Sequence, residues 1–172
     1  MPKTLDDVTF GFTVNGTAKN TLDLTYAQAV LAYAKSGSLV TGTGANQADR
    51  IFSDQRTIAP SANDDLDLTG TTLQDNLGEN LALARIKVLA VYAAAANANT
   101  LVMGGAAAAA ITTILGGTNP TLTIRPGGMF LITAPDATGF AITATTADIL
   151  RFTNGGAGTS VTYDIVVIGA SA

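Results

Sequence analysis

The sequence predicts a mainly β protein, an antiparallel β-sandwich of jelly-roll-like type with an N-terminal arm or small subdomain. Three observations predict it. Short runs of alternating apolar and polar residues recur through the C-terminal half, and glycine, proline and asparagine separate these runs. The runs recur about every ten residues. Short strands at regular spacing with turn residues between them are typical of sandwiches and jelly rolls.

The clearest strands lie after residue 120. Residues 121–125 alternate, and Pro126-Gly127 suits the two central positions of a type II turn. Residues 129–133 are apolar on both faces, which is typical of a central strand. Residues 161–167 place one row of side chains on a single face: Val161, Tyr163, Ile165 and Val167. Shorter strands are expected at 140–143 and 149–152, with loops at 135–139 and 154–156.

Earlier segments carry weaker patterns. Residues 81–92 alternate over eight positions and favour a strand, although their alanine and leucine content makes a helix the competing interpretation. The alanine run 106–110 fits a short helix or an irregular loop, because glycine pairs bound it closely. Residues 54–58 fit a short strand or an extended crossover.

The first 46 residues leave the choice of element open. Residues 22–33 fit the period of a strand and that of a helix equally well. Asn15-Gly16 is a natural hairpin turn, and residues 36–46 are rich in glycine, threonine and serine, as a loop would be. We therefore expect an N-terminal arm or extension over residues 1–60, one that a neighbouring subunit could exchange, followed by a β-sandwich domain over residues 61–172.

Composition excludes several classes of function. The chain has no histidine and no cysteine, which removes Ser-His-Asp and Cys-His catalysis, zinc sites, iron–sulfur clusters and disulfides. With nine basic residues against 13 acidic ones it neutralises little phosphate, so nucleic acid is not an expected partner. A surface this poor in charge suits burial against other subunits.

No membrane partner is expected either. Residues 88–124 carry no charge, yet asparagine and threonine interrupt them and the rest depends on alanine and glycine, which contribute little to bilayer insertion. The first seven residues lack the apolar core of a signal peptide.

One acidic cluster, Asp64, Asp65 and Asp67, has the oxygen ligands that calcium prefers, and the competing interpretation is a solvated loop leading into a strand. The pattern of an EF-hand is absent. Glu79 lies in an expected turn, and nothing selects it as half of a catalytic carboxylate pair. Residues 42–46 lack the third glycine of a dinucleotide loop and are expected to be a turn. We therefore expect no catalytic residue, no cofactor and no metal ligand.

Five short motifs occur in a fixed order: Gly42-Thr43-Gly44-Ala45-Asn46-Gln47-Ala48-Asp49, Asp65-Leu66-Asp67-Leu68, Ala84-Arg85-Ile86-Lys87, Arg125-Pro126-Gly127-Gly128 and Asp164-Ile165-Val166-Val167-Ile168-Gly169. This set resembles small virion structural proteins of tailed bacteriophages, of the capsid cement or decoration type. The resemblance covers residues 42–169, and the first 40 residues match it least. It implies a β-sandwich that assembles, as a trimer, on the capsid lattice.

The expected function is therefore that of a capsid decoration protein and not of an enzyme. Its partners would be the major capsid protein, bridged across neighbouring capsomers, and further copies of itself. It would reside on the capsid surface of the virion after synthesis in the host cytoplasm. Two alternatives stay open: a tail or fibre component of the virion, and a carbohydrate- or receptor-binding β-sandwich that would use exposed aromatics such as Tyr26 and Tyr33.

Overall fold

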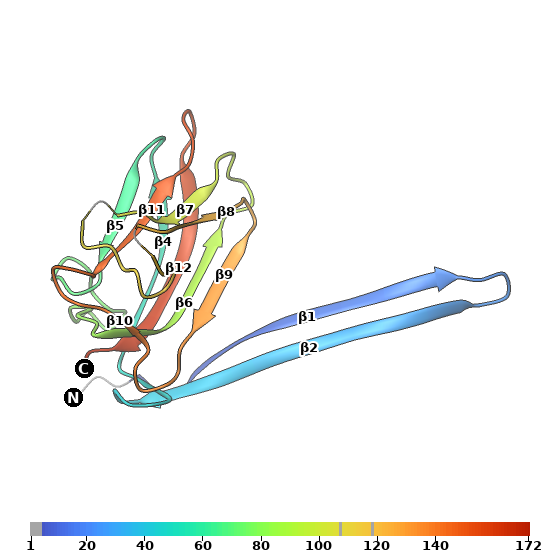
Figure 1. Ribbon diagram of the computed structural model, residues 1–172, viewed down its shortest axis with the longest axis horizontal. Helices are drawn as coiled ribbons and strands as arrows, with labels where there is room; N and C mark the ends of the chain where they lie inside the picture. The colour runs from blue at the N-terminus through green and yellow to red at the C-terminus, as the bar shows by residue number, and fades with distance from the viewer. Residues whose placement is uncertain (1–4, 107, 118) are drawn as a thin grey trace.

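The structure is a computed structural model that describes residues 5–106, 108–117 and 119–172. Within these residues all the regular secondary structure is β-strand, which confirms the predicted mainly-β, sandwich-like class. Two sheets form the body of the molecule, and a long two-stranded ribbon projects from it (Figure 1). The described residues contain no helix with the length and apolar character needed to cross a bilayer. The finer jelly-roll assignment stays a prediction.

The larger sheet has five antiparallel strands. In it β12 lies between β4 and β6. The other edge of β6 pairs with two strands one after the other, with β10 at residues 85–86 and with β9 at residues 88–92. These strands are β4 (Arg50–Ile58), β6 (Arg85–Ala93), β9 (Met129–Thr133), β10 (Phe140–Ala141) and β12 (Val161–Ala170).

The smaller sheet has four antiparallel strands in the order β5-β11-β7-β8. These strands are β5 (Asn63–Asp67), β7 (Leu101–Gly104), β8 (Thr121–Ile124) and β11 (Ile149–Asn154). The two sheets face each other and share one hydrophobic core.

The core confirms the predicted inner face of the last strand. Val161, Tyr163, Ile165 and Val167 of β12 are all buried between the sheets. From the opposite sheet, the ring of Phe152 packs 4.6 Å from that of Tyr163, measured between centroids. Burial of each such large side chain stabilises the fold by roughly 1.5–3 kcal/mol.

The predicted turn at Pro126-Gly127 is present. Gly127 has a φ of +76°, and the backbone N–H of Gly128 donates to the carbonyl of Arg125 at 2.8 Å. A positive φ at this third position is what a type II turn requires, and glycine meets it without steric cost.

Two expectations for the body need correction. Strand β6 begins at Arg85, not at residue 81, because Ala82 adopts a φ of +38° that breaks the extended backbone. Strand β9 is an edge strand, not a central one, and Met129 is 81% exposed. Of the two alternatives for the alanine run, its described residues, 106 and 108–110, form the irregular loop, and Ala107 lies outside the described residues.

The N-terminal ribbon is the pair of antiparallel strands β1 (Val8–Thr21) and β2 (Tyr26–Thr41), closed by a turn at residues 22–25. The hairpin turn predicted at Asn15-Gly16 is therefore wrong, since both residues pair with β2 in mid-strand. In the observed register residues 26–35 pair with residues 12–21, which a turn at Asn15-Gly16 would prevent. The loop predicted over residues 36–46 is wrong for residues 36–41, which belong to β2.

The sandwich also begins earlier than residue 61. Strand β4 precedes that boundary, yet it pairs along β12 from Ile58–Val161 to Arg50–Gly169. Phe52 and Ile58 of β4 are buried in the shared core, so removing this strand would expose one side of it. The short strand β3 (Gln47–Ala48) joins the ribbon to the body by pairing in parallel with the end of β2.

Candidate functional site

The two faces of the N-terminal ribbon differ sharply in chemistry. Directly paired residues of an antiparallel ladder share a face, so the register assigns every side chain to one side. The ribbon's apolar face carries mainly apolar side chains: Val8, Phe10, Phe12, Val14, Ala18, Ala27, Ala29, Leu31, Tyr33 and Leu39. The other face carries mostly hydroxyl, amide and small side chains, with Lys19, Tyr26 and Val30 among the larger exceptions.

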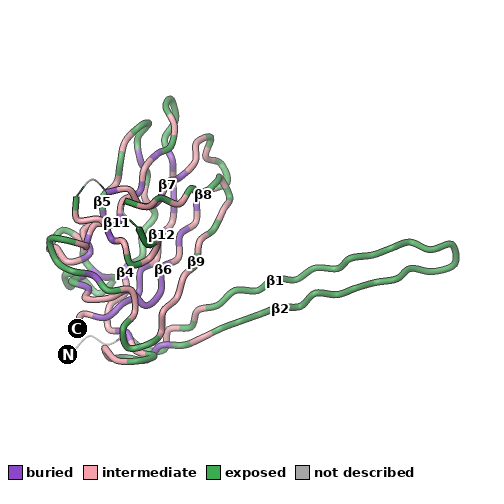
Figure 2. The backbone as a smooth tube through the Cα atoms, in the orientation of Figure 1, coloured by how far each residue is buried: buried purple, intermediate pink, exposed green. Residues whose placement is uncertain are grey.

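Most of this apolar face is uncovered. Phe12 is 50% exposed and Leu31 is 54% exposed, and the ribbon is exposed along nearly its whole projecting length (Figure 2). The rings of Phe12 and Tyr33 contact each other at 5.7 Å between centroids, which covers only part of each ring. Contiguous exposed apolar surface marks interaction sites, and an isolated two-stranded hairpin is at best marginally stable in water.

The near end of the ribbon shows what this face packs against. Val8, Phe10 and Leu39 lie in a second hydrophobic cluster with Val88 of β6 and Ile168 of β12. Val88 and Ile168 point away from the smaller sheet, so the ribbon base covers one end of what we call the outer sheet face. The ribbon's apolar face is therefore complementary to this surface where the two meet.

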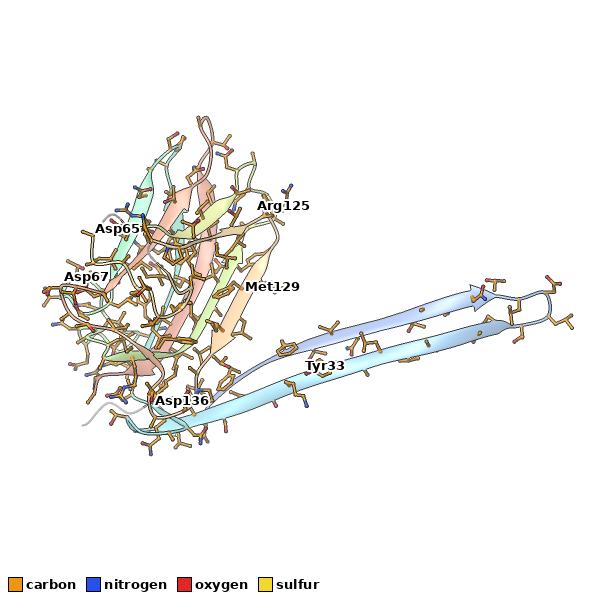
Figure 3. The ribbon with its side chains drawn as sticks, viewed as in Figure 1. Tyr33, Asp65, Asp67, Arg125, Met129 and Asp136 are labelled. Atoms are coloured by element: carbon orange, nitrogen blue, oxygen red, sulfur yellow. The ribbon has the colours of Figure 1, made fainter. Side chains whose placement is uncertain are left out.

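Beyond the ribbon base the outer sheet face is open. A groove of about 420 Å³ runs across it, with mostly apolar walls that include Phe10, Ala90, Met129, Leu131, Val166 and Ile168. A smaller hollow of about 220 Å³ lies in the angle between ribbon and sheet, where Phe10 and Phe12 face Leu131 and Thr133. Figure 3 shows Met129 on β9 and Tyr33 on the ribbon, on either side of this angle.

Charge is distributed unevenly between ribbon and body. Residues 8–41 hold two lysines and one aspartate, a net charge of +1, and the other residues hold seven basic and twelve acidic side chains, a net charge of −5. The two ribbon ammonium groups lie over aromatic rings, Lys19 at 5.4 Å from Tyr26 and Lys35 at 5.5 Å from Tyr33. The ribbon is therefore apolar with a weak positive charge, while the body is acidic.

Asp64, the first residue of the predicted acidic cluster, points to the edge of the core. Its carboxylate accepts two hydrogen bonds from Arg56 at 2.6 and 2.9 Å and one from the hydroxyl of Tyr163 at 2.9 Å. Burial raises the pKa of Asp64, but these hydrogen bonds outweigh burial and hold the pKa below its ordinary value. The pKa of Tyr163 is raised, first by burial and then by the charge of Asp64.

The other two carboxylates are also engaged within the chain. Both oxygens of Asp65 accept from the guanidinium of Arg151 at 2.6 Å, and this pairing raises the pKa of Arg151. Asp67 accepts from the backbone N–H groups of Thr69 and Gly70. Within the described ranges no three acidic side chains converge as metal ligands would. The three carboxylates therefore fasten the body of the fold.

The remaining sequence candidates lie in turns. Asp75 accepts from the backbone N–H groups of Leu77 and Glu79, which shapes the expected turn around Glu79. Residues 42–46 form bends and a turn, as predicted, in which the Gln47 side chain accepts from the N–H of Gly44 at 2.8 Å. None of these positions lies in the groove on the outer sheet face.

Lys87 belongs to one of the five motifs, but its burial was not expected from the sequence. Its ammonium donates to the carbonyl of Asp136, and burial, with the charge of Arg85, lowers the pKa of Lys87. The loop that it reaches is closed by the Asp136 side chain, which accepts from the N–H groups of Gly139 and Thr138 and thereby has a lowered pKa. Lys87 therefore anchors this loop to β6.

No family model matches the chain, and neither a curated protein nor a solved structure matches it. The ribbon's apolar face was the main feature missed from the sequence. The signal in the sequence was two short alternations, Phe12 with Val14 and Leu31 with Tyr33, in which the apolar residues are two positions apart. These alternations form one surface only when the two strands pair.

Proposed function

We propose that this chain is a structural subunit of a bacteriophage particle, a capsid decoration protein that binds the outer shell and bridges neighbouring capsomers. The observation that carries the proposal is the N-terminal ribbon, which extends an uncovered apolar face well beyond the sandwich. A strand of 14 residues such as β1 spans about 47 Å at ~3.4 Å per residue. Such an arm reaches a neighbouring subunit from a compact body.

The surface chemistry supports a permanent assembly. The exposed positions of the chain carry mostly hydroxyl, amide and small side chains in place of charges, which suits contacts that exclude or trap water. Contacts built from such groups weaken little as salt rises, because few of them depend on exposed ion pairs. Many copies on one lattice add modest individual contacts into a stable layer.

The motif order noted above supports the phage assignment in particular, since it resembles capsid cement proteins over residues 42–169. The role needs no chemistry beyond binding. The partners in this proposal are the major capsid protein and further copies of the chain.

The test is to locate and count the chain on particles of the phage that encodes it. Gradient-purified particles are analysed by quantitative mass spectrometry and by cryo-electron microscopy. We expect many copies, with density on the outer shell at a repeated lattice position. A handful of copies at the tail would assign the chain to the tail or a fibre, and its absence from particles would overturn the proposal.

A further inference from the structure

We infer that the ribbon's apolar face docks on the outer sheet face of a second copy of this chain. The inference deepens the proposed function, because it names the partner that covers the arm. It rests on three features of the molecule: the match between the two surfaces, the mismatch in length between the ribbon and its own sheet, and the opposite charges of ribbon and body.

The match between the surfaces is already visible at the ribbon base. There Val8, Phe10 and Leu39 pack against Val88 and Ile168, on the same outer sheet face that is open further along. The open part presents Met129, Leu131 and Val166, side chains of the same kind as those at the base. A second ribbon laid along the groove would therefore extend an interface that the fold already makes.

The chain's own sheet is too short to cover its ribbon. Strand β12, the longest of the sheet, has 10 residues and spans about 33 Å at ~3.3 Å per residue, whereas β1 and β2 have 14 and 16 residues. The ribbon also leaves the body at an angle and ends far from it (Figure 1). Even a ribbon folded back on its own sheet would leave the distal end uncovered, so a second molecule is needed.

Charge favours a second copy over an unrelated apolar surface. The ribbon carries +1 and the rest of the chain carries −5, so ribbon and body of two copies attract each other. Lys35 lies on the ribbon's apolar face, opposite Phe12, and Asp164 lines the groove on the outer sheet face. A contact between ribbon and body joins two different patches, so it links copies head to tail and closes when they form a ring.

The test uses charge insertion with matched controls in the full chain. On the ribbon, Leu31→Glu places a carboxylate on the apolar face, and Val30→Glu places it on the opposite face at the neighbouring residue, which is 65% exposed. On the body, Met129→Glu alters the groove, and Thr123→Glu alters an exposed position of the smaller sheet. Circular dichroism confirms that each variant is folded, and light scattering with sedimentation velocity measures its mass over a dilution series.

We expect the unmodified chain, Val30→Glu and Thr123→Glu to form the same oligomer. Leu31→Glu and Met129→Glu should each weaken self-association by at least about 30-fold, the effect of losing a central interface residue. Mixing these two variants should restore a heterodimer, because the intact ribbon of one meets the intact sheet of the other. Normal assembly of Met129→Glu would show ribbon-to-ribbon pairing and overturn the inference, as would an unmodified chain that stays monomeric.

The outcomes for assembly and for function are separable. Self-association that depends on Leu31 and Met129, in a chain that is absent from particles, would uphold this inference and overturn the proposed function. A chain found on the shell in many copies, with its mass unaffected by either variant, would uphold the proposed function and overturn this inference.

Discussion

Replacing Asp64 with alanine should destabilise the sandwich more than replacing any carboxylate of the exposed ion pairs. The Asp64 carboxylate joins three strands, because it accepts from Arg56 of β4 and from Tyr163 of β12 while belonging to β5. Tyr163 is 0% exposed, so its hydroxyl is shielded from water in the folded chain and depends on Asp64 as its hydrogen-bond acceptor.

The magnitude follows from these contacts. A buried hydroxyl left without its partner costs about 1–3 kcal/mol. The lost pairing with Arg56 adds about 1 kcal/mol, because that guanidinium is partly exposed and keeps Asp54 at 2.9 Å. The free energy of unfolding should therefore fall by roughly 2–4 kcal/mol, which lowers the Tm by about 5–15 °C for a chain of this size.

The assay compares four variants with the unmodified chain by urea denaturation and thermal melting. Tyr163→Phe removes the hydroxyl together with its need for a partner and should cost only about 1–2 kcal/mol. The double variant should lose less free energy of unfolding than the sum of the two single losses, because both substitutions remove the same hydrogen bond between Tyr163 and Asp64. Asp65→Ala, which breaks a more exposed pair with Arg151, is the control and should cost under about 1 kcal/mol. Equal losses for Asp64→Ala and Asp65→Ala would refute the reasoning.

Three further outcomes are expected. Folding lowers the pKa of Asp64, so its stabilising contribution is present above the unfolded pKa of about 3.9 and is lost as pH falls through the folded value. The difference in free energy of unfolding between the unmodified chain and Asp64→Asn should therefore close in acid. A difference that stays constant would contradict this. The distal ribbon can be removed by replacing residues 13–34 with Asn-Gly, because a two-residue turn then joins the paired residues Phe12 and Lys35. This change should shift the Tm of the sandwich by under about 4 °C and abolish self-association. A large drop in Tm would show that the distal ribbon supports the body. Gly127→Ala should lower the free energy of unfolding by about 1 kcal/mol, measured by urea denaturation. The loss comes from backbone strain, because Gly127 has a φ of +76°, and not from a clash, because the nearest side chain is 3.6 Å from the new Cβ. An unchanged urea midpoint would count against the turn assignment.

Local signals explain which elements could be predicted from the sequence. The period-two row on β12 and the Pro126-Gly127 turn depend on neighbouring residues alone, and both are present. Whether β9 is a central or an edge strand depends on which other strands lie beside it in the sheet. Residues 129–132 gave β9 two apolar faces, which suits a central strand. Here Phe130 and Ile132 pack on the core, and the face with Met129 and Leu131 lines an open groove at the sheet edge.

The ribbon could not be recognised because its register is set by distant pairs. Gly16 meets Leu31 and Val14 meets Tyr33, and no local pattern distinguishes these pairs from those of a turn at Asn15-Gly16. The same applies to the acidic cluster, whose partners Arg56, Arg151 and Tyr163 come from three other strands. The three carboxylates lie within four residues of the sequence, and the fold directs them to different partners.

The position of the charges supports the proposed self-association. Several of its few ionised groups are used inside the body, where Arg56 pairs with Asp64, Arg151 with Asp65, and Arg50 lies 3.6 Å from the buried Asp75. These groups fasten strands and add little to solubility. What the body and ribbon then offer to water includes two apolar surfaces of the same character, one on a projecting arm and one on a sheet. Part of each surface is uncovered in the described residues, and in the proposed contact the apolar ribbon face of one copy and the apolar sheet face of another would leave water together.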